Sequence, residues 1–157
     1  MKTKKTPIAI ELQLASKVPN IPALDLFKQW AYAALASQKD KAELCIRIVD
    51  EQESAELNET YRHKQGPTNV LSFPFEPFIG LNIEPDYLGD IIICAPIVQR
   101  EAKEQELPEI AHWAHMTVHG ILHLLGFDHI HEPDAAIMEQ LEANILAQLG
   151  FDNPYGA

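Results

Sequence analysis

The chain has 157 residues, enough for one domain with a buried core, and its 46% hydrophobic and 22% charged residues are ordinary for a globular protein. No stretch approaches the length of a membrane span, so no membrane association is expected. The net charge of −11 argues against a protein that binds nucleic acid through its general surface, so any RNA contact must come from a local patch.

The chain begins with an alternation of strand and helix patterns. Residues 7–14 place apolar side chains at every second position, which predicts a half-buried strand. Residues 22–36 are expected to form a helix with a proline in its first turn. Residues 43–49 repeat the alternating pattern and predict a second strand.

A second helix and a short strand are expected next. Asp50 is the expected N-cap of a helix that runs to about Arg62, and Glu53 completes a capping-box-like pattern three residues later. Residues 70–75 predict a short strand that is ended by proline. Residues 76–86 contain two prolines and a glycine and are expected to form a loop.

The remaining elements are one strand followed by helices. Residues 88–94 form an apolar run that predicts a strand buried on both faces. Helices are expected at 96–105, 108–125 and 133–149. The resulting order, β-α-β-α-β-β-α-α-α, predicts an α+β (α/β-like) fold. It is a single domain of residues 1–157, with a small mixed sheet of about four strands packed by about five helices.

The helix expected at 108–125 has a histidine face and an apolar face. At about 100° per residue, four histidines fall within an arc of roughly 80°, and they are His112, His115, His119 and His123. The opposite side is expected to face the core, and it consists of Ile110, Trp113, Ala114, Val118, Ile121, Leu124 and Leu125. Leu122 borders the histidine arc and is expected to help wall it. The plainer interpretation is a solvated helix face that carries histidines.

Three histidines of this region have the spacing H-x3-H-x5-H. His119 and His123 lie on one face of a helix, because they are four residues apart. Gly126 can end that helix in a left-handed turn, so that the chain folds back and brings His129 to the same point. Three converging imidazoles without cysteine are typical of a catalytic zinc site, so one zinc ion per chain is predicted on this central helix.

The same spacing occurs in the H-E-x-x-H-x-x-G-x-x-H helix of metzincin proteases. Those proteases carry a glutamate after the first histidine as the general base for peptide hydrolysis, whereas this chain has Gly120 there. Peptidase activity is therefore the weaker hypothesis. What remains is a metal that acts as a Lewis acid and activates water, which suits attack on a phosphodiester.

Residues 62–64 concentrate basic side chains in an otherwise acidic chain. The planar fork of Arg62 matches phosphate oxygens two at a time, and beside a zinc it would stabilise the charge that develops there. The alternative is a helix C-terminus whose cations favour the helix dipole. Some polar residues that follow are suited to satisfying backbone groups of a turn and a strand end, and they are Thr68, Asn69 and Ser72.

Taken together, the motifs resemble those of the YbeY family of bacterial endoribonucleases. They are H-G-x-L-H-L-x-G-x-D-H at 119–129, Y-R-x-K…T-N-V-L-S-F-P at 61–74 and L-G-D at 88–90, and the resemblance covers essentially the whole chain. It implies a zinc-dependent, single-strand-specific endoribonuclease of the cytoplasm, which acts in maturation of the 16S rRNA 3′ end and in ribosome quality control. It also implies that the catalytic residues include Arg62 and His119, and that the zinc ligands are His119, His123 and His129.

Other features fit these expectations. Cys45 and Cys94 are far apart and form no C-x-x-C, which suits a reducing cytoplasm, and no apolar signal-peptide region follows the basic N-terminus. The resemblance also implies work on the ribosome with ribosomal proteins and an assembly GTPase. A surface of −11 would suit a basic small-subunit protein.

Residues near the predicted zinc site have roles that the sequence leaves open. Arg62 is expected to clamp the scissile phosphate, and Lys64 is a candidate substrate contact. His115, one turn before His119, is a candidate proton carrier or RNA contact. Asp128 either orients a ligand or stabilises the turn.

Some functional alternatives also stay open. The nucleophile is either water or the RNA 2′-hydroxyl. Two other function classes remain, namely a metal-dependent hydrolase of another kind, such as a peptidase, and a mainly non-catalytic ribosome-assembly factor. The second of these fits the acidic charge, which leaves little electrostatic affinity for free RNA.

Overall fold

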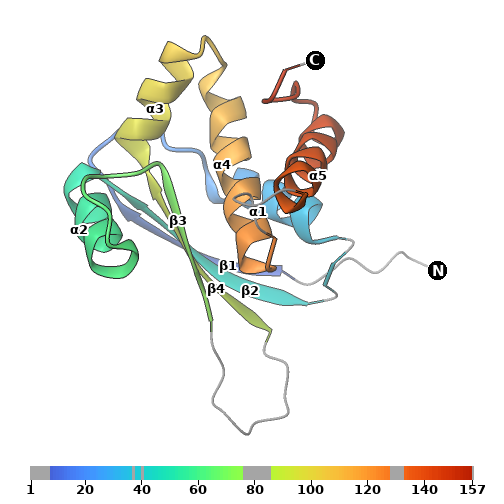
Figure 1. Cartoon of the computed structure of the whole chain (residues 1–157), viewed down its shortest axis with the longest axis horizontal. Coiled ribbons are helices and arrows are strands. Elements are labelled where there is room, and N and C mark those ends of the chain that lie inside the picture. The colour runs from blue at the N-terminus through green and yellow to red at the C-terminus, as the bar shows by residue number, and fades with distance from the viewer. Residues whose placement is uncertain (1–7, 37, 40, 76–85, 128–132, 157) are drawn as a thin grey trace, which may run out of the picture.

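The structure is a computed structural model, and it describes residues 8–36, 38–39, 41–75, 86–127 and 133–156. Within these residues the chain forms four strands and five helices in the predicted order (Figure 1). The strands are β1 (Ile8–Ala15), β2 (Ala42–Val49), β3 (Val70–Pro74) and β4 (Tyr87–Cys94). The helices are α1 (Leu24–Leu35), α2 (Glu51–Arg62), α3 (Ala95–Glu104), α4 (Glu109–Leu124) and α5 (Asp134–Gln148). No helix in these ranges is long and apolar enough to cross a membrane.

The strands of the described residues form one mixed sheet in the order β1-β2-β4-β3. β1, β2 and β4 are parallel, and β3 pairs antiparallel with β4, so β3 is an edge strand. β4 is paired with a strand on each side and is buried on both faces of the sheet. This burial explains its nearly continuous apolar run. The predicted α+β class and the small mixed sheet are confirmed.

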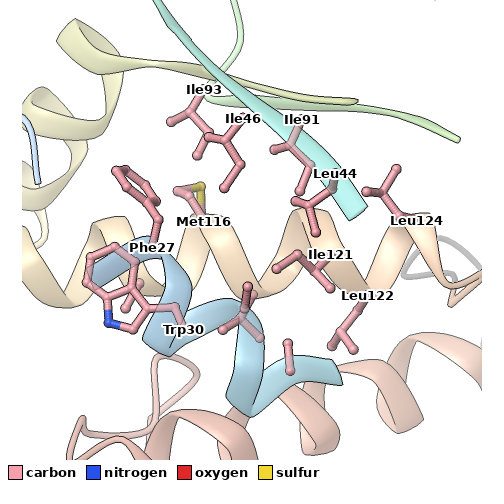
Figure 2. Close-up of a cluster of buried hydrophobic side chains, with 14 of the residues drawn as sticks. Phe27, Trp30, Leu44, Ile46, Ile91, Ile93, Met116, Ile121, Leu122 and Leu124 are labelled. Atoms are coloured by element: carbon pink, nitrogen blue, oxygen red, sulfur yellow. The ribbon is translucent and has the colours of Figure 1, made fainter. Parts of the chain in front are cut away.

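The main core lies between one face of the sheet and the helices α1 and α4, with α5 packed behind them (Figure 1). Leu44 of β2 and Ile91 of β4 point from the sheet towards Ile121 of α4 (Figure 2). Phe27 and Trp30 of α1 close this core, with ring centroids 5.3 Å apart in an edge-to-face arrangement. Burying each such side chain stabilises the fold by about 1.5–3 kcal/mol, so this layer accounts for much of the stability.

A smaller core lies on the opposite face of the sheet, under α2 and the start of α3. Its buried members are Val49, Leu71, Ile92, Cys94 and Ile97, with Leu57 and Phe73 packed against them. Successive side chains of β3 and β4 enter the two cores in turn, because neighbouring residues of a strand point to opposite faces of the sheet. β3 is therefore held from both sides, which fixes the edge of the sheet next to α4.

α4 is more deeply buried than its helical wheel predicted. The expected apolar side is largely buried, but Ile110 is 37% exposed, which contradicts its place in the predicted core face. His112 and Leu122 are buried as well. The wheel assumed that only one face of the helix is covered, whereas α4 contacts the sheet, α1, α3 and α5. Ile110 is exposed although it is apolar, and it lies in the first turn of the helix.

The predicted capping box at α2 does not form. Asp50 is the N-cap residue, but its carboxylate accepts hydrogen bonds from the Ser16 hydroxyl and the Lys17 amide N–H instead of from the helix. These hydrogen bonds lower the pKa of Asp50 below its usual value. Glu53 pairs with Arg47, whose Nε lies 2.6 Å from Oε2. The acidic side chains therefore join the start of α2 to β2 and to the residues that follow β1, because tertiary neighbours compete with local capping.

Candidate active site

A cleft of about 570 Å³ opens between the end of α2, the edge strand β3 and the second half of α4. Arg62 and Lys64 line it from the α2 side, and His119 and His123 line it from α4. These residues come from the two segments, 58–74 and 119–129, that carry the motifs of interest in the sequence. The fold therefore places candidate phosphate-binding and metal-binding side chains around one space.

Gly120 allows α4 to lie close to the sheet at this point. A Cβ at this position would lie 2.9 Å from Cγ2 of Ile91 and 3.3 Å from the hydroxyl of Ser72. The Ser72 hydroxyl donates a hydrogen bond of 3.0 Å to the Gly120 carbonyl, which ties β3 to α4. No room exists for the protease glutamate at this position, so the packing explains the glycine that the sequence showed.

The turn after α2 is held by two buried polar side chains. His63 adopts a left-handed conformation with φ of 58° and ends the helix. The Asn58 side-chain amide donates a hydrogen bond of 2.9 Å to the Gly66 carbonyl, and Ser54 exchanges hydrogen bonds with the backbone of Thr68 at 2.9 and 3.0 Å. Buried polar groups need such partners, and here they fix the path of the segment that carries the basic residues.

The Arg62 guanidinium is anchored at the rim of the cleft. Its Nη2 donates a hydrogen bond to the Ser72 carbonyl, and its Cζ lies 4.9 Å from the centre of the Phe73 ring. A guanidinium has five N–H donors in a planar fork, so this anchoring still leaves donors for a phosphate. Arg62 therefore has a defined orientation at the cleft, and it also lies in the last turn of α2, as the helix-end alternative expects.

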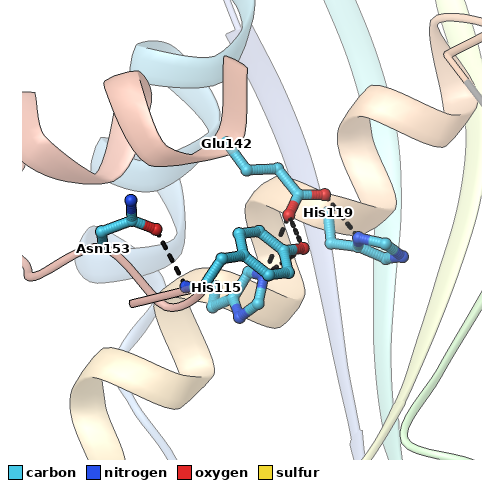
Figure 3. A network of polar contacts seen from close by, with 5 residues as sticks. His115, His119, Glu142 and Asn153 are labelled. Atoms are coloured by element: carbon cyan, nitrogen blue, oxygen red, sulfur yellow. Dashed lines mark hydrogen bonds and ion pairs between the residues drawn. The ribbon is translucent and has the colours of Figure 1, made fainter. Parts of the chain in front are cut away.

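A buried carboxylate on α5 organises the histidines (Figure 3). Glu142 is fully buried, and its Oε2 accepts a hydrogen bond of 2.5 Å from Nδ1 of His119. Its Oε1 accepts hydrogen bonds from Nε2 of His115, at 3.0 Å, and from the hydroxyl of Tyr155. Burial opposes ionisation of Glu142, but these hydrogen bonds outweigh it and lower the pKa to about 2. The site thus contains a buried carboxylate anion held by two imidazoles and a phenol.

His115, His119 and Glu142 form a group that could hold a metal, since their ligand atoms lie within 4.8 Å of one another. The hydrogen bonds favour a different role for Glu142, because a metal placed among the three would have to displace them. A carboxylate that accepts from Nδ1 of a histidine fixes the tautomer and assigns metal coordination to Nε2. Glu142 is therefore better suited to orienting His119 than to binding the ion directly.

The predicted zinc ligands are placed only in part. His119 and His123 lie together, with ring centroids 4.7 Å apart, and both line the cleft. His129 and Asp128 lie outside the described residues. His115 contacts Glu142 and Tyr155 and is not among the described residues that line the cleft.

His112 has a separate structural role. Its Nε2 lies 2.8 Å from Oε1 of Glu101 on α3, and the side-chain amide of Asn69 donates to the same carboxylate at 3.1 Å. Asn69 also accepts a hydrogen bond from the Val70 N–H through its side-chain oxygen. The expectation that this asparagine satisfies a strand end is confirmed. His112 and Glu101 thus connect α4, α3 and the start of β3.

Glu142 and Tyr155 were missed by the sequence-based prediction. One signal was present for Glu142, because Met138, Ile145 and Leu146 place it on the apolar stripe of the last helix. A carboxylate on such a stripe is almost always paired when it is buried. Tyr155 follows the last helix, and nothing local in its sequence pointed to this contact.

Comparisons with known proteins give matches over most of the chain. The family model described as endoribonuclease YbeY matches residues 11–150. A protein of Coxiella burnetii (strain Dugway 5J108-111), named endoribonuclease YbeY, is 51% identical over 151 residues, which cover 94% of this chain and 98% of that protein. The solution structure of TM1509 from Thermotoga maritima has a similar fold, with a TM-score of 0.57 and 22% identity, over 93% of this chain and 99% of that one.

Proposed function

The chain belongs to the endoribonuclease YbeY family and is a hydrolase that acts on RNA, and from this premise we propose that it cleaves single-stranded RNA with the help of zinc. The observation that carries the proposal is the cleft shared by Arg62, His119 and His123. Cleavage of a phosphodiester needs one group that holds the phosphate and another that activates the attacking oxygen. The cleft contains candidates for both.

The proposed zinc ligands are His119, His123 and His129, with one ion per chain. His119 suits this role because its Nδ1 is engaged by Glu142, and His123 lies beside it. His129 is included on the strength of its spacing and of the family motif. When bound, zinc supplies a Lewis acid that polarises a phosphoryl oxygen and lowers the pKa of water.

Arg62 is proposed to hold the scissile phosphate, and Lys64 is proposed as a second substrate contact. Arg62 is anchored by Ser72 and Phe73, so it presents its remaining N–H donors with little loss of side-chain entropy on binding. Lys64 adds a positive charge at the same cleft. In a chain of net charge −11, this pair would concentrate the affinity for phosphate at one place. His115 and Asp128 are proposed only as supporting groups.

The biological substrate is proposed to be 16S rRNA, in the maturation of its 3′ end and in ribosome quality control in the cytoplasm. The family membership supports this assignment. The acidic surface supports binding to a basic small-subunit ribosomal protein, with an assembly GTPase as a second proposed partner.

A mainly non-catalytic assembly factor is the second candidate, because a net charge of −11 gives the general surface little attraction for free RNA. A peptidase is disfavoured, since Gly120 has no room for the glutamate that a metzincin uses.

The test of the proposal is cleavage by protein stripped of metal and then reloaded with zinc. Single-stranded RNA, duplex RNA and casein are offered to the wild type and to the variants Arg62→Glu and His119→Ala. We expect zinc-dependent cleavage of single-stranded RNA alone, with losses of at least about 100-fold in both variants, because each removes a group that stabilises the transition state.

Arg100→Ala is the matched control, because Arg100 is an exposed arginine that pairs with Glu51 and is not among the described residues that line the cleft. It should cleave like the wild type. Cleavage that persists unchanged in Arg62→Glu and His119→Ala would come from a contaminating nuclease, and the proposal would be abandoned.

A further inference from the structure

Two exposed aromatic residues are chain neighbours of residues that line the cleft, since Tyr61 precedes Arg62 and Phe75 follows Pro74. Tyr61, the residue before Arg62 on α2, is 58% exposed, and Phe75, the residue after β3, is 47% exposed. Neither ring is among the described residues that line the cleft. A single exposed ring is ordinary on a protein surface, but these two rings offer stacking faces close to the residues of one cleft.

Each exposed ring is held by a second, half-buried ring. Tyr61 meets Phe73 edge to face, with centroids 5.4 Å apart and an interplanar angle of 70°. Phe75 meets Tyr87 in the same way, at 5.5 Å and 79°. Phe73 packs against the smaller core, and the Tyr87 hydroxyl donates a hydrogen bond to Asp90. The exposed rings are therefore supported from below and present their outer surfaces to solvent.

The four rings form one strip, which we define as Tyr61, Phe73, Phe75 and Tyr87. Phe73 and Phe75 are two residues apart on extended backbone, so their side chains point to the same face of the sheet.

Arg62 connects the strip with the cleft. Its guanidinium lies over the Phe73 ring and it also lines the cleft. Pro74, between the two phenylalanines, lines the cleft from the other face of β3. Because β3 is the edge strand, Phe73 and the cleft residues Ser72 and Pro74 point to opposite faces of a single strand. A chain that passes over this edge can place a phosphate at Arg62 and its neighbouring groups on the strip.

We propose that Tyr61 and Phe75 are a stacking platform for unpaired RNA bases that flank the cleaved bond, with Phe73 and Tyr87 as positioning residues. The proposal rests on the ribonuclease function proposed above. A chain of net charge −11 cannot hold RNA through a general basic surface, whereas aromatic faces stack bases without requiring charge. A platform of this kind also selects single strands, because the faces of paired bases are covered by their neighbours in a duplex.

The test uses Tyr61→Leu and Phe75→Leu, which keep an apolar side chain and remove the aromatic face. Michaelis constants are measured for a short single-stranded RNA and for the same RNA with abasic nucleotides on both sides of the cleaved bond. On the intact RNA, we expect each variant to raise KM about tenfold with kcat nearly unchanged, the size expected for one lost stack. On the abasic RNA, wild type and variants should differ by less than about twofold.

The matched control is Tyr32→Leu, because Tyr32 is a 38% exposed tyrosine on α1, away from the strip. It should not change KM. Equal losses on intact and abasic RNA, or a fall in kcat at unchanged KM, would overturn the proposal, because the rings would then serve only to position Arg62.

A binding measurement separates this proposal from the ribonuclease function. Fluorescence anisotropy with the intact and abasic RNAs is carried out in the His119→Ala background, where cleavage is not required. Weaker binding of intact RNA in the Tyr61→Leu and Phe75→Leu variants supports the platform even if the wild type cleaves no RNA. If the His119→Ala protein with Tyr61 and Phe75 intact binds the intact and the abasic RNA with equal affinity, the platform is overturned, even if the wild type cleaves RNA efficiently.

Discussion

Glu142 is the side chain on which the orientation of His119 depends. It is fully buried, it is ionised because its pKa is about 2, and it accepts hydrogen bonds from His115, His119 and Tyr155. Leaving any of these partners unpaired in the interior costs free energy, so the network favours a single arrangement. The position of one carboxylate on α5 thus sets which nitrogen of His119 faces the cleft.

Glu142→Gln tests this orienting role. Glutamine keeps the size of the side chain, but its amide group presents N–H donors where the carboxylate accepts from two imidazoles. We expect zinc affinity to fall on the order of 10–100-fold, as for other partners of metal-bound histidines. Competition titration with a zinc chelator measures this directly. Glu139→Gln, an exposed position on the same helix, is the control, and an unchanged zinc affinity in Glu142→Gln would contradict the assignment.

The close packing of α4 against the sheet is the element-level feature that builds the cleft. Gly120 and Ser72 form the contact between α4 and β3, and Ile91 of β4 lies directly beneath. The same contact places His119 and His123 opposite the end of α2. The geometry of the cleft therefore depends on a position that carries no side chain.

Gly120→Ala is expected to push α4 away from the sheet. The added Cβ would lie 2.9 Å from Cγ2 of Ile91, which real contacts do not allow. We expect a loss of about 1–3 kcal/mol in the free energy of unfolding, although alanine has the higher helix propensity. Urea denaturation of the two single variants and of the double variant with Ile91→Ala measures the coupling. The cost of Gly120→Ala should shrink in the Ile91→Ala background, and a cost that is independent of Ile91 would show that another contact causes it.

The polar side chains of an element can form hydrogen bonds other than those that their local sequence pattern predicts. Asp50 and Glu53 have the spacing of a capping box, yet they bind Ser16, Lys17 and Arg47. The local spacing makes capping hydrogen bonds possible. The fold brings competing partners from β2 and from the residues that follow β1 close to the same carboxylates, and the hydrogen bonds form with these partners instead.

The whole molecule is strongly acidic, although it belongs to a family of endoribonucleases whose substrate is itself an anion. Its net charge is −11, and the cleft holds Arg62 and Lys64 as its described cations. Attraction to RNA should therefore come from few phosphate contacts and, on our proposal, from base stacking. The basic ribosomal protein that we propose as a partner would add affinity to these contacts.

The salt dependence of RNA binding tests this balance. With two phosphates neutralised, the slope of log K against log salt concentration should be about −1.4 for a single strand. Lys64→Ala should reduce its magnitude by about 0.7, while Tyr32→Leu should leave it unchanged. Anisotropy titrations between low and moderate salt give the slope. A slope several-fold steeper would mean that an extended basic surface binds RNA.

Much of the fold could be predicted from the sequence, because it depends on short-range patterns. Strand alternation, apolar runs and proline or glycine breaks placed four strands and five helices of the described residues in the right order. The proximity of Arg62 to the histidines was expected from the family motifs, and the cleft contains them together. The zinc ligand set stays a prediction, since His129 lies outside the described residues.

Features that depend on several elements at once could not be predicted in this way. The helical wheel of α4 assigned Ile110 to the core, but this residue is exposed. The wheel also treated four histidines as one face, whereas His112 forms a hydrogen bond with Glu101, and His115 and His119 form hydrogen bonds with Glu142. Periodicity and spacing describe one element and its immediate neighbours along the chain. The pairing of a carboxylate on α5 with histidines on α4 depends on how helices pack, which involves residues more than twenty positions apart and leaves no local signature.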